Sequence, residues 1–445
     1  MNSNTLKFLE TAFGEYYSNL FVKMADVESN EAPDTWKDEW WNGADHIPSN
    51  PTQREWGYVP FRNVESGRPP LYRHISLTNH DNDLNKFLQQ TRPKDIYFSK
   101  STYQHPGENN MQDKRITSTY PVFDLDSDSN GDYKNALSSC KSELEKLLWF
   151  LEKMFDVDIE THTQMYFSGG KGYHVHLKDP RFLHDGNEKW SDIVDYTTAQ
   201  NVTLESISKP AKNIQSNSID MEIGDRMQFI SPTGWGEITI AAMQTYLSKV
   251  YTQTTDSSDK ITVKTLTNGS DTYSDKIQNA VIKLDGIGAK RANAIAQNVE
   301  LLYRGGYIKS SGTEMVYESL LESVLESFAP TFDEPVAIDK SRIIRLPLSL
   351  HGGTGFRVTP VTRKQLDSFN PFKHAVPKRF RVNENADIGV DVKIINEDYT
   401  QIRISNSDPL NCDLSNGDIA KVNLPIAIYH ALSGDVEIMD EEPRI

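Results

Sequence analysis

The sequence predicts a mixed α/β (α+β) fold with a central mixed β-sheet that is interrupted by a mainly helical insertion. Apolar residues recur at helical spacing in Asn135–Phe155, whereas Gln164–Ser168 and Tyr173–Leu177 are typical of two strands joined by a glycine turn. Strand-like patterning returns at Ile343–Leu348, beyond a stretch at 251–275 that is rich in Thr, Ser and Asp. This return indicates that one domain is resumed after an insertion.

The remaining elements follow the same mixed pattern. In chain order, we expect a helix over 3–25, strands at Asp95–Ser99 and Tyr120–Asp126, helices over 187–206 and 276–329, a strand at Phe356–Thr362 and β-like segments beyond 380. The predicted regions are the first part of an α/β domain (1–245), a mainly helical insertion (246–330), and the second part of the α/β domain with a β-rich tail (331–445).

Composition limits the class of protein. The 445 residues carry a formal net charge of −16, which argues against binding nucleic acid through bulk positive charge but not through metal ions and a local basic groove. No run of about 18 apolar residues occurs, so we expect no membrane span. Cys140 and Cys412 cannot build a disulfide framework or a four-cysteine metal site, which fits a reducing cytoplasm.

The first candidate site is the pair Asp124 and Asp126 at the end of an apolar segment. Residues two apart on a strand point to the same face, about 6.5–7 Å apart, so both carboxylates could reach two divalent cations about 3.5–4 Å apart. The same sequence pattern would also occur if a strand simply ended in a polar turn without any metal site. An aspartyl-nucleophile phosphatase is a further alternative. A calcium loop starting at Asp126 is disfavoured, because its twelfth position is Leu137 instead of Glu.

The second candidate site is the glycine turn Ser168-Gly-Gly-Lys-Gly-Tyr-His-Val-His176. Its backbone N–H groups, the Ser168 hydroxyl and the Lys171 ammonium could form a phosphate cradle, although the spacing is not that of a P-loop. His174 and His176 would share one strand face. A plain hairpin turn with partly buried histidines is the structural alternative.

The third candidate, from Asp333 to His351, is uninformative alone. Its Asp333, Arg345 and His351 stand in a stretch punctuated by Pro and, directly after His351, by Gly.

Together these three segments resemble the small catalytic subunit of archaeal and eukaryotic DNA primases. That family carries Asp-x-Asp, then Ser-Gly-x-[Arg/Lys]-Gly-x-His, and far downstream a third Asp before R-x-P-x-S-x-H-x-x-T/S-G. All appear here in that order, and the segments Arg54–Gly57 and Arg92–Ser99 also look like the archaeal branch, with haloarchaeal members most similar. The resemblance runs from about residue 5 to 380.

The resemblance implies a primase-type fold and template-directed primer synthesis from nucleoside triphosphates with two Mg²⁺ or Mn²⁺ ions. It also implies a single-stranded DNA template and a large subunit that bears an iron–sulfur cluster. Asp124, Asp126 and Asp333 match the metal ligands, and Asp333 is favoured over Asp339 because it stands eighteen positions before His351. The residues that match nucleotide contacts are Ser168, Lys171, His174, Arg345 and His351, with Glu55 and Arg73 matching more weakly.

Local sequence around the third acid yields a structural expectation. Pro335 disfavours helix at Glu334, so Asp333 would project from an extended segment. Asp339 would then serve as the N-cap of the next element.

Two departures from the family pattern matter. The usual zinc knuckle after the Asp pair is missing, because between that pair and the glycine turn the chain has only Cys140 and the distant His162. We therefore predict no structural zinc. Gly170 stands where eukaryotic members often have Arg, so one phosphate contact is missing or is supplied elsewhere.

One further motif lies in the insertion. The segment Leu284–Ile295 resembles the hairpin of a helix-hairpin-helix element, which could contact DNA phosphates through Gly286, Gly288, Lys290 and Arg291. A glycine-stopped helix that packs on its neighbour is the alternative. Two other functions stay open: a metal-dependent phosphohydrolase using the Asp pair, and a non-catalytic nucleic-acid-binding subunit using this hairpin.

Overall fold

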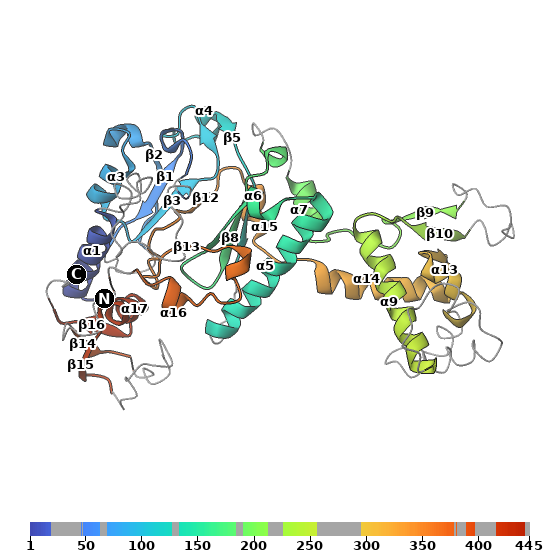
Figure 1. The fold of residues 1–445 in the computed structure, drawn as a ribbon. Coiled ribbons are helices and arrows are strands. Elements are labelled where there is room, and N and C mark those ends of the chain that lie inside the picture. The colour runs from blue at the N-terminus through green and yellow to red at the C-terminus, as the bar shows by residue number, and fades with distance from the viewer. Residues whose placement is uncertain are drawn as a thin grey trace. The chain divides into compact units, whose positions relative to one another are not determined.

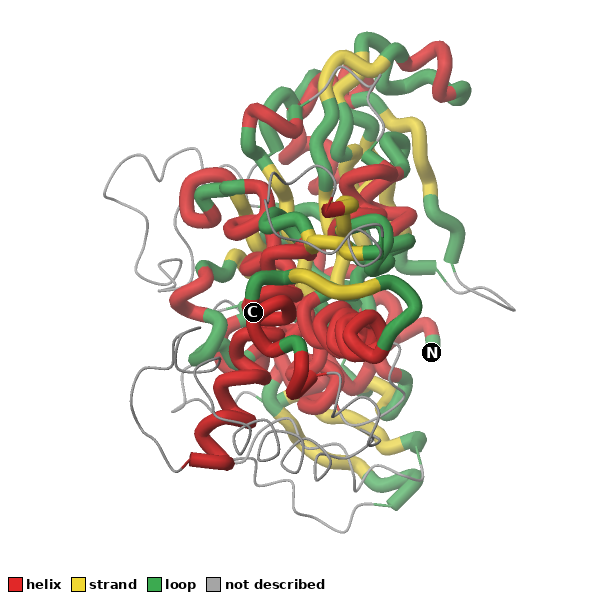
Figure 2. The backbone as a smooth tube through the Cα atoms, turned by 90° about the vertical axis from the view of Figure 1, so that its right-hand side faces the viewer, coloured by secondary structure: helices red, strands yellow, loops and turns green. Residues whose placement is uncertain are grey.

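The structure, a computed structural model, forms two compact units. Unit 1 consists of Met1–Leu148, Val157–Ser191 and Thr331–Ile445, and unit 2 of Trp149–Asp156 and Asp192–Pro330. The second unit therefore begins well before residue 246, because strands upstream of the Thr/Ser/Asp-rich stretch belong to it. The structure describes residues 1–18, 46, 48–62, 69–126, 133–183, 190–211, 226–255, 295–377, 380, 389–396 and 415–440; the other segments are grey in Figures 1 and 2.

The first sheet of unit 1 has the strand order β12-β3-β1-β2. Along β3, Ile96 and Phe98 are buried while Asp95 and Tyr97 are only partly buried, as expected for a strand with one face in the core. Helices α1 and α3 contribute Phe8, Phe13 and Phe87 to that same core, and Figure 1 shows both helices beside this sheet. The bounds are β1 Trp56–Val59, β2 Tyr72–Ile75, β3 Asp95–Ser99, β12 Ile343–Arg345, α1 Ser3–Tyr17 and α3 Leu84–Thr91.

The second sheet of unit 1 has the order β13-β7-β8-β6. Strands β7 and β8 are joined by the glycine turn, as the sequence predicts, and β8 also pairs with β6. The leucine stripe of α5 is buried at Leu144, Leu147, Leu148 and Leu151, which confirms its amphipathic pattern. The bounds are β6 Val122–Leu125, β7 Thr163–Phe167, β8 Tyr173–Leu177, β13 Thr359–Pro360 and α5 Tyr133–Phe155.

The C-terminal tail forms a third sheet, β15-β14-β16. It packs near the N-terminus, where Ile438 N–H donates to the Thr5 hydroxyl (2.8 Å). The tail also contains a helix, α17, that we did not predict. The bounds are β14 Val390–Ile394, β15 Ile419–Val422, β16 Val436–Ile438 and α17 Leu424–Ser433; smaller elements of unit 1 are β4 Thr102–Tyr103, β5 Ile116–Ser118, α4 Met111–Lys114, α6 Ile159–His162, α15 Glu334–Ile338 and α16 Pro371–His374.

Unit 2 combines helices with a three-stranded sheet, β11-β10-β9. Met243, Leu302 and Tyr317 are central to its core. Helix α7, Ser191–Thr197, begins at the boundary of the two units. The other bounds are β9 Ser208–Pro210, β10 Met227–Ile230, β11 Gly306–Ile308, α9 Trp235–Thr255, α13 Val299–Tyr303 and α14 Gly312–Phe328.

The predicted class is confirmed, since helices and strands are mixed throughout the described chain (Figure 2). The arrangement of the sheet differs from the expectation. In place of one central mixed sheet, the described strands form several small sheets in which every pairing is antiparallel. The strands are two to five residues long and are broken by turns, so the periodicity could reveal each strand but not its partners. None of the described helices is both long and apolar enough to span a membrane.

Candidate active site

The acidic pair lies at the end of β6. Asp124 is on the strand, opposite His174 of β8 in the antiparallel register, and exposed Asp126 follows Leu125 immediately. His174 Nε2 is 3.4 Å from Asp124 Oδ1. Burial raises the pKa of the Asp124 carboxyl; the nearby His174 opposes the rise, and the charges of Asp126 and Asp333 add to it. The three acids are therefore close enough to repel one another.

His174 is buried between its neighbours. Burial lowers the pKa of its imidazole, and Nδ1 has no hydrogen-bond partner among the described residues. The His174 ring therefore lies beside the Asp124 carboxylate without neutralising it.

The glycine turn is closed on itself. Ser168 N–H donates to Gly172 O (2.9 Å), while the N–H groups of Gly170 and Gly172 donate to Ser168 Oγ (3.3 and 3.2 Å). Gly169 has a φ of +85°, and a Cβ on Gly172 would lie 2.1 Å from Leu125 O. The expected open cradle is thus wrong in part: two of its amides are already satisfied by Ser168.

Two side chains outside the turn fix its carbonyl groups. Tyr133 OH donates to Gly170 O (2.8 Å), and Thr354 Oγ1 donates to Gly169 O (2.6 Å). Sequence reasoning missed both roles. For Thr354 the signal was present, because the Thr/Ser of the downstream block stands at this position; nothing local marks Tyr133, which reaches the turn from α5.

Arg345 lies beside β3. It forms an ion pair with Asp95, and its Nη2 donates to Tyr97 OH (3.2 Å). The N–H of Gly352 also donates to Asp95 Oδ1 (2.8 Å). Burial alone would raise the pKa of Asp95, but Arg345, His351 and the Gly352 N–H together outweigh it and hold the pKa below its ordinary value. The Arg345 charge is therefore already balanced, and Asp95 and Tyr97 belong to the site although we did not single them out.

His351 begins the turn that follows. Its N–H donates to Phe356 O (2.8 Å), and its Nδ1 accepts from Gly353 N–H (3.1 Å). Burial and the nearby Arg345 lower the pKa of His351 to about 3, so its ring is neutral at physiological pH. A Cβ on Gly169 would lie 2.6 Å from His351 Cβ, so the two turns are packed against each other.

These groups surround one pocket of about 180 Å³ between the first and second sheets of unit 1. Seven predicted site residues line it, and the apolar part of its wall comes mainly from β12 and α15. The lining consists of Asp124, Asp126, Ser168, Lys171, His174, Arg345, His351, Gly170, Tyr97, Val122, Val336, Ile343 and Ile344.

Asp333 lies next to this pocket without lining it. It is the N-cap of α15, where its side chain accepts from Val336 N–H (3.3 Å). Asp333 itself is extended, as expected, but the expectation of no helix at Glu334 was wrong, because α15 begins there and tolerates Pro335 in its first turn, where no amide donor is needed. Asp339 ends this helix instead of starting the next element, and its carboxylate accepts from Ser341 N–H (2.8 Å).

Glu55 and Arg73 are not brought to the pocket. Glu55 is fully buried, and its carboxylate accepts from Arg73 Nε (3.0 Å), His74 N–H (3.2 Å) and Lys114 Nζ (2.8 Å). This cluster links β1, β2 and α4 and has the character of a structural ion pair. The hairpin residues Gly286, Gly288, Lys290 and Arg291 lie outside the described residues.

Whether the pocket suits a metal ion depends on the donor atoms that its side chains offer. Carboxylate oxygens are the ligands that Mg²⁺ and Mn²⁺ prefer. A cation would favour the charged form of Asp124, whose pKa is raised by burial and further by the charges of Asp126 and Asp333. Within the described part of the chain, no group of three or more His, Cys, Asp or Glu side chains is already arranged to hold a metal ion. The acids fit divalent cations chemically, and they do not form a preformed cage.

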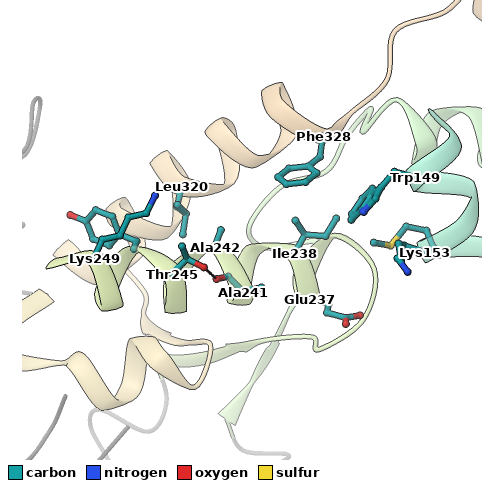
Figure 3. A pocket seen from close by; sticks show the side chains of 12 residues that line it. Trp149, Lys153, Glu237, Ile238, Ala241, Ala242, Thr245, Lys249, Leu320 and Phe328 are labelled. Carbon is teal, nitrogen blue, oxygen red and sulfur yellow. Dashed lines mark hydrogen bonds between the residues drawn. The ribbon is translucent and has the colours of Figure 1, made fainter. Parts of the chain in front are cut away.

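A second hollow of about 640 Å³ lies in unit 2, between α9, α14 and the end of α5 (Figure 3). Its floor is apolar, with Ile238, Ala242 and Leu320, and Trp149 and Phe328 are at one end. Glu237 is the one acid in its described lining, so it lacks the clustered acids of the first pocket.

Comparison with known proteins connects this geometry to a family. A family model described as DNA primase small subunit matches residues 123–363. A DNA primase small subunit from Halobacterium salinarum is 31% identical over 345 residues, which cover 75% of this chain and 81% of the relative. Another from Halorubrum lacusprofundi is 29% identical over 393 residues, covering 85% and 87% of the two chains.

Among solved structures, the polymerase domain from Mycobacterium tuberculosis ligase D in complex with DNA aligns with 85% of this chain and 91% of its own. The TM-score is 0.29 at 11% identity, a similarity too low to specify a fold. The sequence matches are sufficient by themselves. With the acidic pair, glycine turn and downstream block gathered around one pocket, the chain belongs to the DNA primase small-subunit family, whose members are catalytic subunits and nucleotidyltransferases.

Proposed function

We propose that this chain synthesises short primers on a single-stranded DNA template from nucleoside triphosphates by two-metal nucleotidyl transfer. The observation that carries the proposal is the composition of the 180 Å³ pocket. It combines Asp124 and Asp126 with Lys171 and Arg345 in the lining of one pocket. Acids that suit divalent cations and bases that suit phosphates are the two requirements of this reaction.

Each residue has a proposed role. Asp124, Asp126 and Asp333 would hold the cations, and His174 would keep Asp124 in position. Lys171 would contact the triphosphate from the glycine turn.

On the opposite wall, Arg345 and the neutral His351 would donate to phosphate oxygens. Ser168 would act mainly by keeping the turn closed, with its hydroxyl facing the pocket. Glu55 and Arg73 are proposed to support β1 and β2, and not to contact the nucleotide.

The charges of the pocket support a requirement for metal. Its described lining holds two carboxylates, and of its two bases Arg345 is already paired with Asp95. A triphosphate would therefore meet net repulsion. When bound, Mg²⁺ or Mn²⁺ would activate the primer 3′-hydroxyl and neutralise the developing charge on the phosphates.

Further assignments belong to the same proposal. The partners are the DNA template and a primase large subunit with an iron–sulfur cluster, since Cys140 and Cys412 cannot supply such a cluster. The location is cytoplasmic. Unit 1 would carry catalysis, and the insertion at 246–330, which falls within unit 2, would contact DNA through Gly286, Gly288, Lys290 and Arg291.

One assay separates this function from its rivals. Purified chain is incubated with single-stranded template, labelled nucleoside triphosphates and Mg²⁺ or Mn²⁺, and products are resolved by length. Template-dependent oligomers with pyrophosphate release support the proposal. Release of orthophosphate without template would identify a phosphohydrolase, and template binding without turnover would identify a non-catalytic subunit.

A matched pair of variants locates the activity. Asp126→Asn removes an exposed carboxylate at the pocket, and Asp81→Asn removes an exposed one that is not part of the pocket lining and that pairs with Lys86 among the described residues. Activity should disappear in the first and persist in the second, with cooperative melting in both. Wild-type synthesis by Asp126→Asn would contradict the assignment of the pocket.

A further inference from the structure

Lys100 is a buried lysine outside the pocket whose side chain reaches α15. It follows the last residue of β3 and is 0% exposed. Its Nζ donates to Val336 O (2.7 Å) and to Ala337 O (2.8 Å) and lies 5.0 Å from the centre of the Trp190 ring. All the surroundings of the ammonium are therefore fixed by the protein: two carbonyl groups and an aromatic face.

Helix α15 depends on such anchors. It has only five residues, Glu334–Ile338, which is too short for a helix to be stable by itself. At its start, Asp333 N–H donates to Asp124 O (2.8 Å). At its end, the two carbonyls held by Lys100 are among those that a helix leaves without internal partners. A cation here also complements the negative end of the helix dipole.

We propose that Lys100 is a positioning residue for metal binding: by clamping the end of α15 to β3, it fixes Asp333, the N-cap of the same helix, beside Asp124 and Asp126. The inference rests on the proposed role of Asp333 as a metal ligand. It deepens that proposal, since it names the group that keeps the third acid in reach. Val336 belongs both to the clamp and to the pocket wall, which connects the two directly.

The clamp does not require a charged lysine. Burial lowers the pKa of Lys100 to about 7, an effect that Asp339 opposes and that Arg342 and Lys340 reinforce. A neutral amine still has two N–H groups, which match the two carbonyls. The positioning effect is therefore present on both sides of neutral pH.

The test measures metal binding directly. Free Mn²⁺ is followed by electron paramagnetic resonance as it is titrated into the full chain without nucleotide. Lys100→Met keeps the apolar stem and removes the donors, and it should weaken Mn²⁺ binding by about 10-fold, as loss of a group that orients a ligand does. The control is Lys114→Met, a second fully buried lysine that donates to Glu55 and Pro106 O instead of α15. It should lower the melting temperature and leave the Mn²⁺ affinity unchanged.

Two further variants separate the possible failures. If Asp333→Ala does not weaken Mn²⁺ binding, the ligand assignment in the proposed function is wrong. If Asp333→Ala weakens binding but Lys100→Met does not, the positioning role is overturned. The double variant should bind no more weakly than Asp333→Ala alone, because Lys100 acts through that residue; additive losses would contradict the inference. Should Lys100→Met fail to melt cooperatively, Lys100→Leu, which also lacks side-chain donors, is tested against the same criteria.

Discussion

The backbone N–H of Asp333 donates to the carbonyl oxygen of Asp124 over 2.8 Å. Residues 209 positions apart are thereby joined through main-chain atoms, independent of either carboxylate (333 − 124 = 209). Removing either side chain leaves this bond in place. Substitution of Asp124 therefore keeps this link, whereas Asp333→Ala also removes the N-cap hydrogen bond from Val336 N–H, so its melting curve is compared with that of the wild type.

The choice between Asp333 and Asp339 can be tested at saturating Mn²⁺. Asp333→Ala should abolish nearly all nucleotide incorporation, because a shared ligand would be lost. Asp339→Ala should keep most activity, since the hydrogen bonds that its carboxylate makes among the described residues go to Ser341, and it should lower the free energy of unfolding by about 1 kcal/mol. Incorporation assays with melting curves decide between them, and a dead Asp339→Ala beside an active Asp333→Ala would reverse the assignment.

The support of the glycine turn predicts a nucleotide-binding effect. Tyr133→Phe removes the donor to Gly170 O, so we expect the KM for nucleoside triphosphate to rise by about 3–10-fold, equivalent to about 0.5–1.5 kcal/mol. Steady-state incorporation kinetics provide the measurement. Tyr317→Phe removes a hydroxyl that donates to Leu302 O in unit 2, and it should leave KM unchanged. An equal rise in both variants would indicate a general loss of stability instead.

The buried Glu55 predicts a dependence of stability on pH. Burial alone would raise the pKa of Glu55, but hydrogen bonds from Arg73 and Lys114 outweigh it and hold the pKa below 4.5. The stabilisation is thus fully present above the unfolded-state pKa and is lost as pH falls through the lower folded-state pKa. Glu55→Gln should lower the free energy of unfolding at pH 7 by roughly 3–5 kcal/mol, because it breaks a buried pair.

Urea denaturation of wild type and Glu55→Gln between pH 7 and pH 3.5 checks this prediction. The difference in unfolding free energy should stay constant down to about pH 5 and shrink below it. Unchanged stability together with a raised KM for nucleotide would instead place Glu55 in contact with substrate, as the family resemblance implied.

The absence of the zinc-knuckle residues from the sequence predicts that the purified protein contains little zinc. Purified chain, analysed without added metal, should contain no stoichiometric zinc. The candidate ligands are dispersed: Cys140 is buried on α5, and His162 lies near Asp179 (3.5 Å between Nδ1 and Oδ2). One equivalent of zinc that survives dialysis against a chelator would show that a ligand set had been overlooked.

Local patterns in the sequence predicted much of the site but less of its connections. Asp124, Lys171 and His351 could be identified because each stands in a motif that is readable within a few residues. Asp95 could not, since its importance arises from an ion pair with Arg345, 250 positions away. Tyr133 and Lys100 were missed for the same reason, because their partners are backbone carbonyls of distant segments. Every residue has such a carbonyl, so the residue types in the sequence do not indicate which one will accept a hydrogen bond.

Elements were predicted better than their pairing. The strand Asp95–Ser99 and the strand Tyr173–Leu177 have the expected bounds, because alternation and turn residues define them locally. The start of α15 was misjudged since Pro335 was read as a helix breaker, whereas in a first turn it has no hydrogen bond to lose.

Because unit 1 is built from separate segments of the chain, the residues of its pocket are synthesised at different times. The chain leaves this unit at Ser191 and returns at Thr331, so Asp124 and Lys171 are synthesised well before Arg345 and His351. At about 5–20 residues per second, the intervening residues 192–330 take about 7–28 s to translate. During that time the nascent chain exposes one wall of the pocket without the other. Nucleotide binding therefore cannot assist early folding on the ribosome, and release of a truncated chain from this interval yields a product with no active site.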